Sequence, residues 1–240
     1  MSGGVGPTVS DIRLTKEEEA AEGKGHLKSQ KQSTRRGFLS FRQLNALAII
    51  VVFSASGMVG IADLAFTVLS LIYVFFLSKV AFPLLGSSPD PPVFGQSNKT
   101  LNLYVSFAAV IGLFLPIAYI FEGILEGDKE GIKAAAPHVF LLASQVFMEG
   151  LTFSAGLSLP IRAFVPVFYN SMRIFTLFDW LKSEIEKVGE GSGGSVRRVY
   201  FGRALAVANL GFWCFNLFGF LLPVYLPLAL KKYYGYKEKI

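Results

Sequence analysis

The chain has 240 residues, of which 52% are hydrophobic and only 17% charged, and its mean hydropathy is +0.48. Soluble domains carry roughly a quarter of charged residues, so this apolar surplus exceeds one water-soluble core and predicts an α-helical integral membrane protein. The net charge of +6 comes without a base-reading motif, which argues against nucleic-acid binding. The single cysteine, Cys214, excludes an intrachain disulfide.

Residues 1–43 are predicted to form a disordered, basic, cytosolic tail. They are rich in Gly, Ser, Lys and Glu and lack the periodic apolar pattern of a packed element. Part of the tail carries basic residues without an acid, a pattern that attracts anionic lipid headgroups. The candidates for this contact are Lys28, Lys31, Arg35 and Arg36. The simpler interpretation of the same charges is an orientation signal for the first membrane span.

The first long apolar block has room for two membrane spans, because about 20 residues cross a hydrocarbon core. We predict spans over residues 44–61 and 64–82, joined by a tight turn. Ser56 and Gly60 are small residues four positions apart. This spacing lets helices approach closely, so both are candidate helix-packing residues.

Two further spans are predicted in the middle of the chain, at residues 101–121 and 134–159. Pro116 lies inside the first of them and has no backbone N–H to donate. We therefore expect a neighbouring helix to bind the carbonyl that this proline leaves free. The stretch between the two spans, residues 122–133, is charged and is predicted to be a turn.

The fourth span carries a polar stripe, because several of its side chains fall on one helix face at about 100° per residue. The stripe consists of His138, Gln145, Glu149 and Thr152. Ionisable groups inside a membrane are costly, so Glu149, which we place near the middle of the span, is the main functional candidate. It is either a protonatable or ion-binding carboxylate or, in the simpler interpretation, a structural carboxylate paired with Arg162 or Arg173. Gln145 is its expected hydrogen-bonding neighbour.

The segment 161–181 is long enough to span but carries several polar residues. Arg162 and Arg173 lie eleven residues apart and therefore share a helix face, while phenylalanines are abundant elsewhere in the segment. This pattern is typical of a helix that lies in the membrane interface. We prefer an interfacial helix here and keep a spanning helix as the alternative.

The C-terminal part is predicted to hold a hydrophilic loop at 182–203 and a last span at 204–230. Asn209 and Asn216 lie seven residues apart on one face of that span and are candidate helix-packing residues. The predicted fold is thus an all-α, polytopic transmembrane bundle of five spans plus one interfacial helix, or of six spans. In both versions Lys and Arg are more numerous on the N-terminal side, which predicts a cytosolic N-terminus.

The sequence contains no P-loop, no nucleophile elbow and no His-Glu-x-x-His motif. Its two histidines are fewer than a membrane metal enzyme needs. We therefore expect no catalytic residue, cofactor or metal. The expected function is that of a structural component of an endomembrane or the plasma membrane that contacts lipid, a membrane-protein partner or a second copy of itself. One alternative is a small transporter or channel in which Glu149 takes up a proton. Another is a lipid-modifying enzyme, for which an acid in the membrane beside cytosolic basic residues is the only support.

Four runs of the sequence resemble a land-plant family of multi-pass membrane proteins. They read FLSFRQLN at 38–45, SASGM at 54–58, YVFFLSKVAFP at 73–83 and MSGGVGP at 1–7. That family is catalogued only as a domain of unknown function. The resemblance therefore implies plant origin and membrane residence, and it transfers no functional residue.

Overall fold

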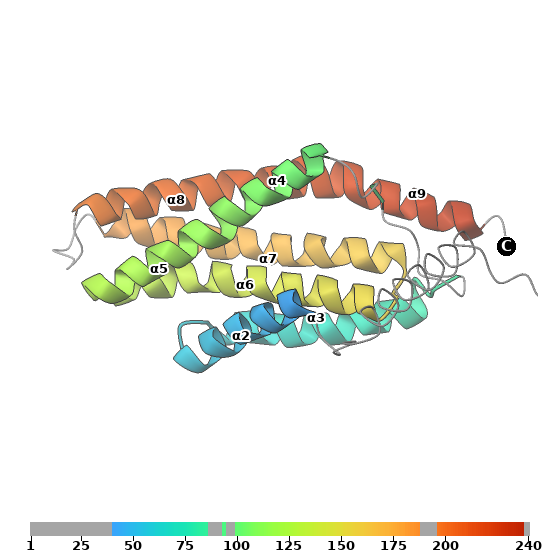
Figure 1. Cartoon of the computed structure of the whole chain (residues 1–240), viewed down its shortest axis with the longest axis horizontal. Coiled ribbons are helices and arrows are strands. Elements are labelled where there is room, and N and C mark those ends of the chain that lie inside the picture. Colours follow the sequence, from blue (N-terminus) through green and yellow to red (C-terminus); the bar gives the residue numbers. More distant parts are fainter. Residues whose placement is uncertain (1–39, 86–92, 95–98, 188–195, 238–240) are drawn as a thin grey trace, which may run out of the picture. The chain divides into compact units, whose positions relative to one another are not determined.

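The computed structural model describes residues 40–85, 93–94, 99–187 and 196–237. The chain divides into an N-terminal unit, Met1–Ser40, and a helical unit, Phe41–Ile240. Most of the predicted tail lies outside the described residues, as do its candidate lipid contacts Lys28, Lys31, Arg35 and Arg36. The described part holds helices and turns without a strand, which confirms the predicted all-α fold (Figure 1).

Ten helical segments follow one another along the described residues, and two of them are π-helical stretches inserted into longer helices. They are α2 (Phe41–Ser56), α3 (Ile61–Val80), α4 (Lys99–Ala109), η1 (Val110–Phe114), α5 (Leu115–Glu126), α6 (Lys129–Ser154), α7 (Leu159–Glu186), α8 (Val196–Cys214), η2 (Phe215–Tyr225) and α9 (Leu226–Lys237). When the segments that follow each other without a break are joined, the described residues form six helices: α2, α3, α4–α5, α6, α7 and α8–α9.

Helices α6 and α7 run antiparallel through the centre of the helical unit (Figure 1). α6 also packs against α2 and α5, and α7 packs against α8 and α9. In the most apolar stretch of α6, 72% of the residues are buried, against 22% in α3. The polar stripe therefore lies on the helix that is enclosed by the others.

Four helices in the described residues are long and apolar enough to cross a membrane: Ile61–Val80, Lys99–Glu126, Lys129–Ser154 and Val196–Gly235. They correspond to the predicted spans at 64–82, 101–121, 134–159 and 204–230. α2 is apolar as well, but its 16 residues make it the shorter helix of the first hairpin.

Large apolar side chains cover the outer face of α3. The exposed ones include Ile61, Val68, Leu69, Ile72 and Phe76. Soluble proteins rarely leave so many large apolar side chains exposed on one helix. The face is suited to an apolar surrounding.

The turns at one end of the bundle are shorter than predicted. The predicted turn at 122–133 is reduced to Gly127 and Asp128, and Gly127 has a φ of 73°, which favours glycine. The predicted loop at 182–203 shrinks as well, because α7 and α8 extend into it from both sides. Charged residues continue these helices because they pair with one another across the bundle.

The segment 161–181, for which an interfacial helix is preferred and a spanning helix is the alternative, lies within α7. α7 lies inside the bundle, antiparallel to α6, and the Arg173 side chain is 0% exposed. An interfacial helix would instead present this arginine to water and headgroups. The polar residues of α7 serve contacts inside the bundle, which is why its sequence resembles that of an amphipathic surface helix.

Ser56 and Gly60 do not form the predicted packing pair. α2 ends at Ser56, whose hydroxyl accepts a hydrogen bond from the Met58 backbone N–H at 3.3 Å. Gly60 precedes α3, and Gly57 between them has a φ of 68°. The two small residues shape the hairpin turn, whereas a packing pair at this spacing requires one continuous helix.

Candidate functional site

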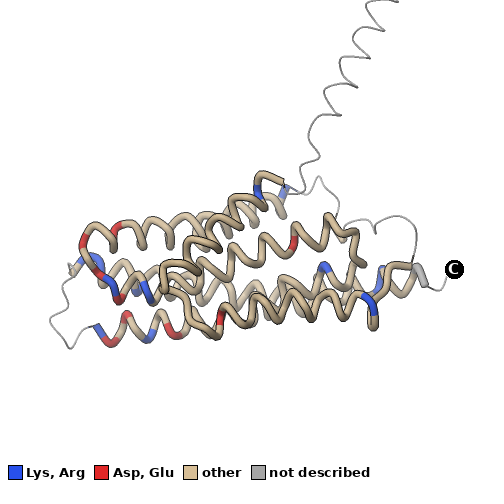
Figure 2. The backbone as a smooth tube through the Cα atoms, turned by 90° about the horizontal axis from the view of Figure 1, so that it is seen from below, with Lys and Arg blue, Asp and Glu red and all other residues tan. Residues whose placement is uncertain are grey.

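Polar side chains inside the bundle form two groups. The core cluster, on α6 and α7, consists of Gln145, Glu149, Asn170 and Arg173. The end cluster lies where α5 turns into α6 and where α7 ends, and consists of Tyr119, Asp128, Glu184, Lys187 and Arg198. Figure 2 shows acidic and basic residues gathered together at this end of the bundle.

The core cluster links a carboxylate on α6 to a guanidinium on α7. Gln145 Nε2 donates to Glu149 Oε1 at 2.7 Å, which confirms the predicted hydrogen bond. The other side of the same amide, Gln145 Oε1, accepts a hydrogen bond from Arg173 Nη2. Arg173 Nη1 also donates to Asn170 Oδ1 at 3.3 Å. Glu149 and Arg173 are therefore coupled through Gln145.

Arg173 also connects α7 to α8. Its guanidinium carbon lies 4.2 Å from the ring centre of Trp213, in cation–π geometry. Asn170 Nδ2 donates to the Trp213 carbonyl at 3.1 Å. A single buried arginine is thus in contact with α6 and α8 as well as its own helix.

Glu149 lies near one end of α6 and not in the middle of the span. α6 ends at Ser154, so Glu149 is about 7.5 Å from that end at about 1.5 Å per residue. The predicted span 134–159 ran too far because the chain turns at Gly156, whose φ is 63°.

A second arginine lies near Glu149. Arg42, at the start of α2, is close enough for its charge to act on the Glu149 carboxylate. The next residue, Gln43, packs directly against Gly150 of α6, where an added side-chain carbon would stand 2.7 Å from Gln43 Cγ. Glu149 therefore has positive charges on two neighbouring helices, α2 and α7.

His138 is fully buried and binds the backbone of a neighbouring helix. Its Nε2 lies 2.8 Å from the Gly112 carbonyl oxygen. A carbonyl oxygen only accepts, so Nε2 carries the ring proton. Pro116, four residues after Gly112, has no N–H to offer this carbonyl, and the backbone here is π-helical. The prediction that a neighbouring helix binds the carbonyl freed by Pro116 is confirmed.

The remaining candidates make contacts of two kinds. Asn216 accepts a hydrogen bond from the Tyr104 hydroxyl at 2.8 Å and so joins η2 to α4, as a packing residue should. Asn209 stays within its own helix, where it accepts from Trp213 Nε1 at 3.2 Å. Thr152 donates to the Glu149 carbonyl at 3.0 Å, also within one helix. Of these three, only Asn216 makes a hydrogen bond between helices.

The end cluster is a network of buried charges. Glu184 Oε1 accepts hydrogen bonds from the Tyr119 hydroxyl at 2.6 Å and from Lys187 Nζ at 2.8 Å. Asp128 Oδ2 accepts from Arg198 Nε at 2.8 Å and from Lys187 Nζ at 3.3 Å. The Arg198 guanidinium stacks over the Tyr119 ring at 4.0 Å. Three long helices and the α5–α6 turn are joined by these contacts.

Asp128 also caps α6. Its Oδ1 accepts a hydrogen bond from the Gly131 amide at 2.8 Å, which satisfies one free donor of the first turn. Burial of the Asp128 carboxyl opposes its ionisation, but the hydrogen bonds from Gly131 and Arg198 and the charge of Lys187 outweigh burial and lower its pKa. The carboxylate is therefore held in its charged form.

These arrangements join helices, and the described surface also has pockets. Two pockets of the described surface, one of about 290 Å³ between α4 and η2 and one of about 360 Å³ between α3, α6 and α7, are lined by none of the stripe residues. Among the described residues, no group of three or more His, Cys, Asp or Glu side chains could hold a metal ion.

Sequence reasoning missed the end cluster because its charged residues were assigned to a turn and a loop. Two local signals were present: Glu184 and Lys187 share a helix face, and Asp128 is a favoured residue at a helix start. The contact between Tyr119 and Arg198 joins residues 79 positions apart, and no local pattern predicts it.

The fold and the two clusters define an all-α bundle with four helices apolar enough to cross a membrane. Residues 39–234 match the family described as Domain of unknown function (DUF7733), and the chain belongs to this family. The expected resemblance to a family of unknown function is confirmed to that extent. Curated proteins give no match to the chain, and solved structures give none.

Proposed function

We propose that this protein is an integral membrane protein with a structural role, which acts by contact with lipid or a partner and catalyses no reaction. The observation that carries the proposal is that the buried charged side chains connect helices. Arg173 and Arg198 are 0% and 1% exposed, and both make contacts that bridge helices. Buried charges that bridge helices give a bundle a specific arrangement.

The outer surface supports membrane residence. The outward face of α3 carries large exposed side chains, and α4–α5 is 22% buried in its most apolar stretch. Helices are the only segments that satisfy every backbone group within a hydrocarbon layer, apart from closed barrels. A bilayer around this bundle would cover the side chains that water disfavours.

We further propose six passes, with the start of α2 and the end of α9 on the cytosolic side. The helix ends on that side carry the basic residues Lys79, Lys99, Lys231 and Lys232. The opposite side carries the end cluster, in which acids and bases are mixed (Figure 2). An excess of Lys and Arg marks the cytosolic side. We place the protein in an endomembrane or the plasma membrane of a land plant, in line with the resemblance of residues 73–83.

Single cysteines test this topology. In a Cys214→Ser background, Lys182→Cys and Ala155→Cys are labelled with a membrane-impermeant maleimide in sealed vesicles whose cytosolic side faces outward. We expect Ala155→Cys to react at once, and Lys182→Cys to react only after permeabilisation. Immediate labelling of Lys182→Cys would support five spans with an interfacial helix. Release of the protein by alkaline carbonate would contradict membrane residence itself.

A second candidate function is a small transporter or channel in which Glu149 takes up a proton. It is favoured by the line of polar contacts that runs from Glu149 through Gln145 to Arg173. Proteoliposomes with an internal pH dye separate the two candidates. The structural role predicts no proton flux above empty liposomes. A flux that Glu149→Gln abolishes, while the exposed control Glu186→Gln retains it, would favour transport.

A further inference from the structure

The smaller of the two pockets lies between the start of α4 and the π-helical η2. It has a volume of about 290 Å³. Its lining consists of Phe94, Thr100, Leu101, Tyr104, Phe215, Gly219 and Phe220. No residue of the core cluster or the end cluster takes part, so this pocket is separate from the features described above.

One lining residue of the pocket is a glycine in the π-helical stretch η2. A side-chain carbon on Gly219 would stand 2.9 Å from the Phe215 ring, so a larger residue would force that ring to move. η2 also contains Pro223, which cannot donate to the helix ladder. π-helical turns are uncommon and are frequent at functional sites.

One rim of the pocket is held in place. The Phe94 ring stacks on Phe220 and on Tyr225, with ring centres 5.9 Å apart in both pairs. The preceding carbonyl, that of Val93, accepts a hydrogen bond from Lys232 Nζ at 3.0 Å. Val93 and Phe94, of which Phe94 lines the pocket, are thus held against η2 and α9.

The inside of the pocket offers apolar contact and few free polar groups. Four aromatic rings and Leu101 make up most of its wall. The hydroxyl of Tyr104 already donates to Asn216 Oδ1 at 2.8 Å. The volume equals roughly ten water-sized groups at about 30 Å³ each, and a methylene group is of similar size. An occupant of matching chemistry is a stretch of hydrocarbon chain.

The pocket opens towards the outside of the bundle. Phe215 and Phe218 of η2 are 61% and 64% exposed, and Leu103 of α4 is 72% exposed. Both segments belong to helices that are long and apolar enough to cross a membrane. If the bundle is embedded as proposed above, the surrounding medium is hydrocarbon, and the chain that enters the pocket comes from a lipid.

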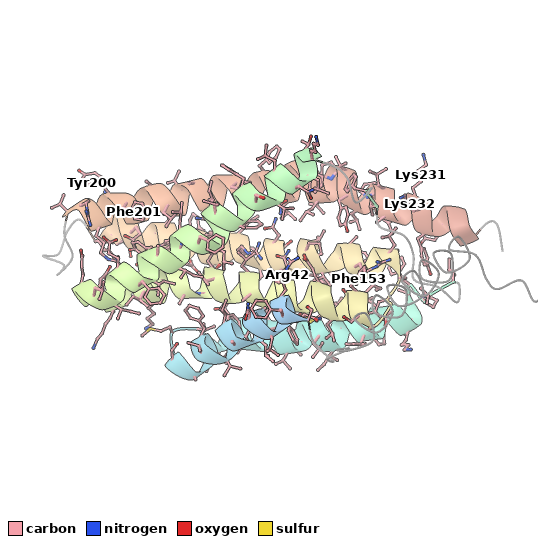
Figure 3. The ribbon with its side chains drawn as sticks, viewed as in Figure 1. Arg42, Phe153, Tyr200, Phe201, Lys231 and Lys232 are labelled. Carbon is pink, nitrogen blue, oxygen red and sulfur yellow. The ribbon has the colours of Figure 1, made fainter. Side chains whose placement is uncertain are left out.

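The charge beside the pocket selects the headgroup. Lys99 adjoins Thr100 at the pocket edge and is exposed at the start of α4, where helix N–H groups add positive potential. α4 and α9 contain no acidic residue, and α9 adds the exposed Lys231 (Figure 3). A negative headgroup is attracted to this surface.

We propose that the pocket between α4 and η2 binds one acyl chain of an anionic glycerophospholipid, whose phosphate lies near Lys99. This inference rests on the proposed membrane residence of the bundle. It assigns a binding site for one class of lipid to a surface whose other parts would contact all lipids alike.

Acyl-chain photolabelling tests the site. The full chain is placed in phosphatidylcholine nanodiscs that contain either phosphatidylglycerol or phosphatidylcholine with a photoreactive group in the chain, and labelled peptides are identified by mass spectrometry. We expect the peptide with Phe215 and Phe220 to be labelled more by the anionic lipid. Lys99→Gln should reduce this preference by about fivefold, the factor that corresponds to one lysine at an anionic surface.

Matched tryptophans separate a pocket from ordinary lipid contact. Leu101→Trp fills the pocket and should reduce labelling to that of the outer face of α3. Leu103→Trp, on the exposed side of the same helix, should leave it unchanged. Lys79→Gln, at the same end of the bundle, controls for Lys99→Gln, and both surface variants leave the core intact.

Three outcomes would overturn the inference. They are equal labelling of the pocket and of the outer face of α3, unchanged labelling in Leu101→Trp, and equal use of both lipids by the pocket. If the outer face of α3 is not labelled by either lipid, the proposed membrane residence fails as well. Labelling of that face without enrichment at the pocket rejects the lipid site alone.

Discussion

His138 Nε2 donates a hydrogen bond to the Gly112 carbonyl oxygen at 2.8 Å, from the centre of α6 to the π-helical η1. The carbonyl needs this donor because Pro116 has none to offer. On the other side, the Trp213 ring lies so close to Gly112 that an added side-chain carbon would stand 2.6 Å from Cζ2. A histidine of the polar stripe thus serves the backbone of a neighbouring helix.

Replacing His138 with leucine should therefore destabilise the bundle by about 1–3 kcal/mol, the usual cost of a buried polar group without a partner. His138→Gln retains a donor and should lose less. Thermal unfolding in mild detergent, followed by circular dichroism, measures both. Equal stability of wild type and His138→Leu would show that the hydrogen bond contributes nothing.

Two adjacent arginines provide a matched test of the end cluster. The side chain of Arg198 is 1% exposed and pairs with Asp128, whereas that of Arg197 is 81% exposed and pairs with Glu122. Removing one partner of a buried pair costs about 3–5 kcal/mol. An exposed pair contributes less than about 1 kcal/mol. Arg198→Met should thus lower the unfolding free energy far more than Arg197→Met. Similar losses would contradict the buried network.

Acid should weaken the bundle through Asp128. The network lowers the pKa of this carboxyl below its ordinary value of 3.8. A lowered folded-state pKa stabilises the fold above pH 3.8, and the stabilisation is lost as the pH falls through the lower value. The stability difference between wild type and Asp128→Asn should be largest near neutral pH and shrink in acid. Unfolding measured from neutral pH to about pH 2 checks this. A difference that grows in acid would contradict the assigned pairing.

Four of the long apolar helices were predictable because a long apolar run has few alternatives to a helix. The contact at Pro116 was predictable for a similar reason, since a missing N–H always leaves a carbonyl without its donor. The hydrogen bond between Gln145 and Glu149 follows from their spacing of one helical turn. In each case the physical cause lies within a few residues of the feature it predicts.

The position of α7 was not predictable in the same way. Arg173 has the same sequence signature whether it faces headgroups or stacks on Trp213, because the partner lies on a different helix. The same holds for Arg198 and Tyr119. α6 ends at Ser154, before the turn at Gly156 and short of the predicted end at residue 159, so Glu149 lies near the end of the helix and not at its centre. The positions of Arg173 and Arg198 depend on contacts with helices that are far away in the sequence.

The link between Glu149 and Arg173 can be measured by a double-mutant cycle. Because Gln145 joins the two groups, the effects of Glu149→Gln and Arg173→Gln on unfolding should not add. Groups in one hydrogen-bond network show coupling energies of about 0.5–3 kcal/mol. A cycle between Glu149 and the distant Arg197 serves as the control and should be additive. Additivity in the first cycle would separate Glu149 from the core cluster.

Glycines separate close helix contacts from open surface. Gly112 faces the Trp213 ring, whereas an added side-chain carbon on Gly211 would meet nothing within 4 Å. Gly112→Ala should therefore destabilise the bundle by about 1–3 kcal/mol, as overpacking does. Gly211→Ala should be neutral or stabilise the helix by up to about 1 kcal/mol, because alanine favours helices over glycine. If thermal unfolding gave both variants the same stability, the close approach of η1 and α8 at Trp213 would be wrong. If Gly112→Ala is the less stable variant, as expected, then Gly112 is a helix-packing glycine and Gly211, which lies between Asn209 and Asn216, is not.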